Sequence, residues 1–66
     1  MKTITILYCI WTNADGCGVQ IEGAYENKAT AESMRDTLQK SAEKWNAAHP
    51  ECTEHYEVET VIVNDA

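Results

Sequence analysis

The sequence has few basic residues. Five Lys and Arg stand against eleven Asp and Glu, which gives a formal net charge of −6. A chain with so few cations is poorly suited to bind nucleic-acid phosphate or an anionic membrane directly, so its charge favours a basic protein partner. No apolar run approaches the roughly 20 residues that a membrane-spanning helix needs. We therefore expect a cytoplasmic protein that makes no direct contact with nucleic acid or membrane.

The chain is also short, with 66 residues. A chain of this size buries only about 60% of the surface that it exposes when unfolded, so there is room for one small core and a single domain over residues 1–66. A buried active site of many residues is not expected. Because no catalytic or cofactor-binding motif is present, the sequence predicts no enzyme, no catalytic residue and no cofactor.

Cysteine is limited to three residues, Cys9, Cys17 and Cys52. An odd number cannot pair completely within one chain, so we expect free thiols and no disulfide framework. Cys52 stands between His49 and His55, which suggests zinc ligands, but structural zinc sites usually show paired Cys-x2-Cys or His-x3-His spacings. The sequence therefore predicts no metal site.

Apolar residues alternate with others over residues 3–11 and again over 19–26, which predicts two strands joined by a turn at 13–18. The period then changes to three and four over residues 28–48, as in an amphipathic helix. Asn27 is suited to cap the start of this helix, with Thr30 as a competing cap one turn later, and Pro50 is suited to end it. A last alternating run predicts a strand over residues 55–64.

This order predicts an α+β domain with a two-layer ββαβ arrangement. A crossover from the second strand through the helix to the third leaves the first strand in the centre of an antiparallel sheet of order 2-1-3, with the long helix on one face. Alternation predicts a core of Ile4, Ile6, Tyr8, Ile10, Val19, Ile21, Val58 and Ile62 against Met34, Leu38 and Trp45. It leaves an apolar set on the other face, which we expect to serve as a dimer or docking face: Leu7, Trp11, Val61 and Val63.

Acidic residues cluster in the second half of the chain. We expect seven carboxylates to form a partner-binding surface: Glu32, Asp36, Glu43, Glu51, Glu54, Glu57 and Glu59. Such a density of negative charge is comparable to that of the phosphates of DNA. It also keeps a small protein soluble, so the cluster alone does not establish a function.

The chain resembles the small acidic anti-CRISPR proteins encoded by phages, most nearly the inhibitors of type I-C Cascade. The resemblance lies in the layout: the strand over 3–11, the strand-to-helix junction Tyr25-Glu26-Asn27-Lys28-Ala29-Thr30, and the acidic helix and strand that follow. It implies a non-enzymatic inhibitor in the host cytoplasm that mimics the charge of DNA and occupies a basic DNA-binding surface of a Cascade subunit. The alternative is a small homodimeric interaction or regulatory module that uses its apolar sheet face.

Overall fold

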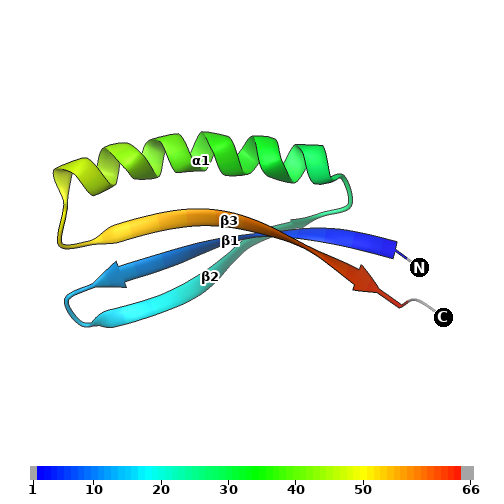
Figure 1. Ribbon diagram of the computed structural model, residues 1–66, viewed down its shortest axis with the longest axis horizontal. Coiled ribbons are helices and arrows are strands. Elements are labelled where there is room, and N and C mark those ends of the chain that lie inside the picture. The colour runs from blue at the N-terminus through cyan, green and yellow to red at the C-terminus, as the bar shows by residue number, and fades with distance from the viewer. Residues whose placement is uncertain (1, 65–66) are drawn as a thin grey trace.

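The computed structural model describes residues 2–64. In chain order this part consists of β1 (Lys2–Asn13), β2 (Gly16–Tyr25), α1 (Lys28–Ala48) and β3 (Thr53–Val63) (Figure 1). The strands form one sheet of order β2-β1-β3, in which β1 is antiparallel to both neighbours. The predicted α+β fold, strand order and single long helix are confirmed.

The turn between β1 and β2 is shorter than the predicted turn over residues 13–18. Both strands continue until only Ala14 and Asp15 separate them, with Asn13 opposite Gly16. The Asn13 side chain accepts a hydrogen bond from the Asp15 N–H (2.8 Å), and Gly16 adopts a φ of 148°. Asn, Asp and Gly favour such a turn because they bond their own backbone or tolerate positive φ.

β2 contains an irregularity that the alternation of residues did not reveal. The register with β1 shifts between Leu7, which lies opposite Gly23, and Tyr8, which lies opposite Ile21. Glu22 is therefore the extra residue of a β-bulge. Because of this extra residue, side chains of β2 that are an even number of positions apart across the bulge point to opposite faces of the sheet. Tyr25 therefore does not share a face with Ile21, as a regular alternation over residues 19–26 would require.

The helix begins and ends where the sequence predicts. The Asn27 side chain accepts a hydrogen bond from the Thr30 N–H (3.2 Å), which satisfies one of the N–H groups at the start of α1. At the other end, the His49 N–H donates to the Trp45 carbonyl (2.8 Å), and Pro50 follows. The predicted cap and the predicted end of the helix are both confirmed.

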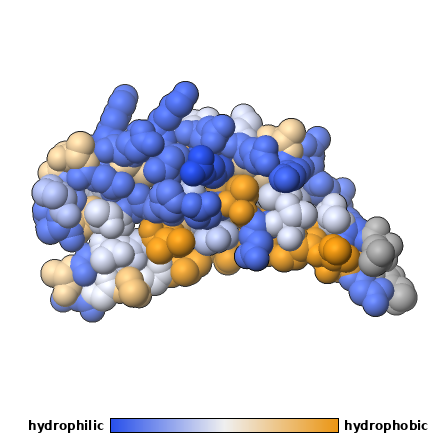
Figure 2. Space-filling model, viewed as in Figure 1, coloured by the Kyte–Doolittle hydropathy of each residue, from blue (hydrophilic) through white to orange (hydrophobic). Residues whose placement is uncertain are grey.

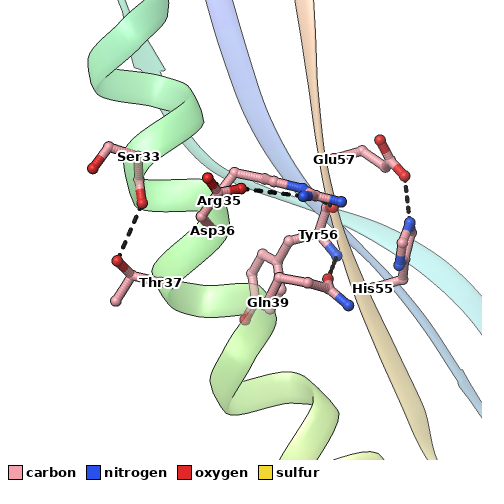
Figure 3. A network of polar contacts seen from close by, with 8 residues as sticks. All are labelled: Ser33, Arg35, Asp36, Thr37, Gln39, His55, Tyr56 and Glu57. Carbon is pink, nitrogen blue, oxygen red and sulfur yellow. Dashed lines mark hydrogen bonds and ion pairs between the residues drawn. The ribbon is translucent and has the colours of Figure 1, made fainter.

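The helix lies over the β3 side of the sheet, and Figure 1 shows it running alongside β3. Polar side chains of α1 hold the outer edge of this strand. Arg35 Nε donates to the Tyr56 carbonyl (3.0 Å), and the Tyr56 N–H donates to Gln39 Oε1 (2.8 Å), as the labelled residues of Figure 3 show. Asn46 bonds both backbone groups of Glu54, each at 2.8 Å. Helix side chains thus take the place of a fourth strand along this part of the edge.

The core differs from the predicted one. The most buried side chains of the sheet are Thr5 (1% exposed), Leu7 (1%) and Cys9 (5%), which face Ala31 and Ala42 of the helix. The predicted set of Ile4, Ile6, Tyr8 and Ile10 points to the opposite face, since strand side chains alternate. The prediction chose the wrong face because β1 is apolar on both sides. Of the predicted helix residues, Leu38 is half-buried, whereas Met34 and Trp45 are 41% and 45% exposed.

The molecule is extended for its length. Its radius of gyration is 13.7 Å, against about 11 Å for a compact chain of this size. Its accessible surface of 4708 Å² likewise exceeds the roughly 4,200 Å² expected of a compact monomer of this mass. The excess reflects a sheet with helix on one side only, so that a large part of the apolar surface is uncovered.

Candidate functional site

The sheet face that points away from α1 carries most of the large apolar side chains. Direct pairing places Ile4 beside Val61, and Ile10 beside Val19. Ile10 is 38% exposed, Val19 63% and Ile21 64%. We call this the open face and define it by its apolar members: Ile4, Ile6, Tyr8, Ile10, Val19, Ile21, Val61 and Val63. In the view of Figure 2, hydrophobic surface gathers over the strands, whereas the helix is mostly hydrophilic.

The four residues predicted for the docking face lie on two different sides of the sheet. Leu7 is buried under the helix, and Trp11 lies on the same side, where its ring packs against Gly18. Neither belongs to an exposed apolar surface of the sheet. Val61 and Val63 do lie on the open face, because they pair with Ile4 and Lys2. The error has the same cause as that in the predicted core: the sequence predicts the helix on the side of β1 that is open in the structure.

The seven predicted acids do not form one surface. Glu32, Asp36 and Glu43 are exposed on α1, but the same helix carries four of the five basic residues of the chain. Lys28 Nζ lies 3.8 Å from Glu32 Oε1, and Arg35 Nη1 lies 3.2 Å from Asp36 Oδ1. The helix is thus slightly basic, and the negative charge of the protein resides in the sheet and the loops.

The remaining four predicted acids point in different directions. Glu57 and Glu59 lie on the open face, where they pair with Tyr8 and Ile6. The Glu57 carboxylate contacts the His55 ring on the side of β3 away from the helix (Figure 3). Glu54 lies on the opposite side of the sheet, and Glu51 is exposed in the connection between α1 and β3.

A pocket of about 520 Å³ opens on the helix side of the sheet, near the β1–β2 turn. Its floor is formed by Cys9 and Trp11 of the central strand, and Trp45 borders it from the helix. Each outer strand contributes one carboxylate, Glu22 from the β2 bulge and Glu54 from β3. The complete lining is Cys9, Trp11, Thr12, Asn13, Gln20, Glu22, Trp45, Cys52, Thr53, Glu54 and Tyr56.

The pocket is negatively charged at neutral pH. Burial, followed by the charges of Cys9, Glu54 and Glu22, raises the pKa of Tyr56 to about 12, so this phenol stays neutral. Burial and the charge of Glu54 also raise the pKa of the Cys9 thiol. No Lys or Arg of residues 2–64 lines the pocket, and neither Glu22 nor Glu54 has an ion pair within that range. No cation of residues 2–64 therefore neutralises its two carboxylates.

The three residues that suggested zinc are not brought together. His49 Nδ1 lies 3.2 Å from the Trp45 carbonyl at the end of the helix, and its ring stacks on that of Trp45. Cys52 lines the pocket, whereas His55 is on the open face. Over residues 2–64 no group of three or more His, Cys, Asp or Glu is arranged to hold a metal ion. All three cysteines are free thiols.

Comparisons with models of protein families, with curated proteins and with solved structures found no match to this chain. No helix within residues 2–64 is long and apolar enough to cross a membrane.

Sequence reasoning missed two features of these surfaces. One is the set of polar helix residues that face β3, namely Arg35, Gln39 and Asn46. A signal was present, because they fall on the same turns as Ala31, Leu38 and Ala42. The pocket was missed because Glu22 and Glu54 meet only through the sheet register and the bulge.

Proposed function

We propose that the chain is a non-catalytic interaction protein that forms a homodimer through the open face of its sheet. The observation that carries the proposal is the contrast between this face and the core. Among residues 2–64, the buried hydrophobic residues are Leu7, Cys9, Ala31 and Ala42. Burying a large apolar side chain contributes about 1.5–3 kcal/mol, so the uncovered Ile and Val residues hold more potential stabilisation than the core does.

The size of the open face suits a second copy of the chain. A three-stranded sheet with strands of about 11 residues covers roughly 500 Å² in plan. Two such faces bury about 1,000 Å² in total, which is the lower limit for a specific interface. Two sheets packed face to face would form a sandwich with the helices outside. His55, Glu57 and Glu59 would then lie along the rim, where polar groups are normal in interfaces.

Sedimentation velocity tests the homodimer. We expect the wild type to sediment as a dimer at micromolar concentration and a Val19→Ser, Ile21→Ser double variant as a monomer with unchanged helix content. Met34→Ser is the matched control, because Met34 is an exposed apolar residue of the helix. A monomeric wild type, or dimers that survive in the double variant, would contradict the proposal.

A second candidate function is the capture of a basic protein surface, as the resemblance to anti-CRISPR inhibitors implies. It is favoured by the distribution of charge: eight of the eleven acids, but only one base, lie outside the helix. Lys2, that one base, is paired with Glu26 (Nζ–Oε1 2.6 Å). The partner to test first is a type I-C Cascade complex, whose DNA-binding groove the carboxylates of Glu51, Glu57 and Glu59 would occupy in place of phosphates.

Competition with DNA for such a complex is the readout. We expect reversal of Glu51, Glu57 and Glu59 to Lys to weaken the competition, mainly through slower association. Reversal of Glu32, Asp36 and Glu43 provides a control of equal charge change, and we expect a smaller effect because these acids stand among helix bases. Equal effects of the two triple variants would show that only net charge matters. No competition by the wild type would contradict the candidate function itself.

A further inference from the structure

The pocket between α1 and the hairpin end of the sheet combines two features that bear on what it can bind. One is a set of aromatic walls: Trp11, Trp45 and Tyr56 all line it. The other is the pair of carboxylates, Glu22 and Glu54, which have no cationic partner within residues 2–64. Its volume of about 520 Å³ is also within the range of small-ligand sites.

The sheet register explains how these groups surround one space. Glu54 lies directly opposite Trp11 in the β1–β3 pairing, and Gln20 lies directly opposite Cys9 in the β1–β2 pairing. Glu22 follows Gln20 on the same face, just before the register shift. The two carboxylates therefore flank the central strand from its two sides. Trp45 reaches the same space from the helix, and Gly18 leaves room for the Trp11 ring, which a Cβ at that position would contact at 2.5 Å.

Aromatic faces and carboxylates together select a cation with an apolar body. Cations are attracted to the faces of aromatic rings, most strongly to Trp. A lysine side chain also carries a hydrophobic stem, which can lie along such rings while its charged end meets the carboxylates. A neutral apolar ligand would leave the two carboxylates without compensation, and an anion would be repelled.

We propose that this pocket binds an alkylammonium group, namely a lysine side chain presented by a basic partner protein. The pocket opens at the surface, where Trp45 is 45% exposed, so a side chain carried by another chain can enter it. The site lies on the opposite side of the sheet from the open face and remains accessible in the homodimer. The inference rests on a basic partner, as the second candidate function does, but it adds a second contact: the pocket uses Glu22 and Glu54 on the helix side of the sheet.

Tryptophan fluorescence provides a direct measurement, because both tryptophans of the chain line the pocket. The probes are the capped peptide acetyl-Gly-Lys-Gly-amide and its norleucine analogue, which keeps the carbon stem but lacks the ammonium group. We expect a saturable change in emission with the lysine peptide that is weaker at high salt, and none with the norleucine peptide. Equal binding of both peptides, or no change with either, would overturn the proposal.

Charge removal then locates the site. We expect the Glu22→Gln, Glu54→Gln double variant to bind the lysine peptide about tenfold more weakly or worse, because neutral amides leave the bound cation unpaired. The Glu32→Gln, Glu43→Gln variant loses the same charge on the exposed helix, outside the pocket, and should bind like the wild type. Circular dichroism checks that both variants fold. Equal affinity of the two variants would place the binding elsewhere.

Choline distinguishes a free small molecule from a side chain, since it carries a similar positive charge without a peptide. Binding of choline more tightly than the lysine peptide would overturn the assignment to lysine. Binding of the lysine peptide together with a failure to compete for Cascade would count against that partner and leave the pocket assignment intact.

Discussion

The two faces of the sheet are built from the same three strands, yet they are covered very differently. On the helix side, Leu7 and Cys9 are 1% and 5% exposed; on the open face, Ile10 is 38% and Ile21 64% exposed. The face richer in isoleucine and valine is the one without a cover. Apolar content alone therefore does not tell which side of a sheet receives the helix.

The fit between surfaces offers a physical reason for the difference. The helix presents Ala31 and Ala42 to the sheet, and both are almost fully buried. Small residues let a helix approach closely, which suits a face where Leu7 stands between Thr5 and Cys9. Thr5 forms a hydrogen bond with Thr60 across the strands (Oγ1–Oγ1 3.1 Å), so its buried hydroxyl is satisfied. The bulkier open face suits another sheet better than this helix.

The largest expected loss of stability comes from truncating a buried side chain on the helix side of the sheet. Leu7→Ala removes the largest of the almost fully buried apolar side chains and should lower the free energy of unfolding by about 2–5 kcal/mol. Ile21→Ala on the open face should cost the monomer less than about 1 kcal/mol, because the side chain is already largely in water. Urea denaturation at low protein concentration measures both. Equal losses would show that the open face is packed in the monomer as well.

A smaller effect is expected from loosening the contact that holds the helix over β3. Asn46→Ala leaves the N–H and carbonyl of Glu54 without the bonds that Asn46 supplies and should cost about 1–3 kcal/mol. Thr37→Ala is the control, since the Thr37 hydroxyl only bonds the Ser33 carbonyl on the exposed helix. Thermal denaturation of both variants is the measurement. An Asn46→Ala variant as stable as the control would show that water replaces these bonds without cost.

The smallest expected effect is a difference between two cysteines in their rate of alkylation, and it involves no change of stability. Thiolates are the reactive form of cysteine, and burial followed by the charge of Glu54 raises the pKa of Cys9. Iodoacetamide at neutral pH should therefore modify exposed Cys17 well before buried Cys9. The modification of Cys9 should accelerate as the solution becomes more alkaline and its thiol loses the proton. Peptide mapping of the native protein at two pH values gives the rates, and early labelling of Cys9 would mean that the helix side opens readily.

The fold could be predicted because its signals are local. The change of period at Asn27, the capping side chain of the same residue and Pro50 mark the helix, and the strand order follows from the connections. The faces could not be predicted in the same way, because Ile4, Ile6 and Ile10 alternate with Leu7, Cys9 and Trp11 and give no contrast across β1. The bulge at Glu22 also reverses which side chains of β2 point to each face of the sheet.

The candidate site was harder to predict than the fold. The acids were visible in the sequence, but their grouping depends on distant residues: Glu32 and Asp36 pair with helix bases, while Glu22 and Glu54 meet across β1. Of the residues that line the pocket, the sequence assigns only Glu54 to a surface for a basic partner, and it does not group Glu54 with Glu22 or the tryptophans. Glu54 had been expected in a broad acidic surface, and Trp11 in an apolar docking face.

The hydrogen bonds from Asn46 and Gln39 to β3 have a consequence for aggregation. An edge strand with free backbone groups is a template onto which strands of other molecules can add, and fibrils grow in this way. At Glu54 and Tyr56 those groups are already bonded by helix side chains: Asn46 bonds both groups of Glu54, Gln39 accepts from the Tyr56 N–H, and Arg35 donates to the Tyr56 carbonyl. The helix therefore also protects the edge: a molecule whose helix detaches would expose an apolar sheet together with an unpaired strand, the two features that promote fibril growth.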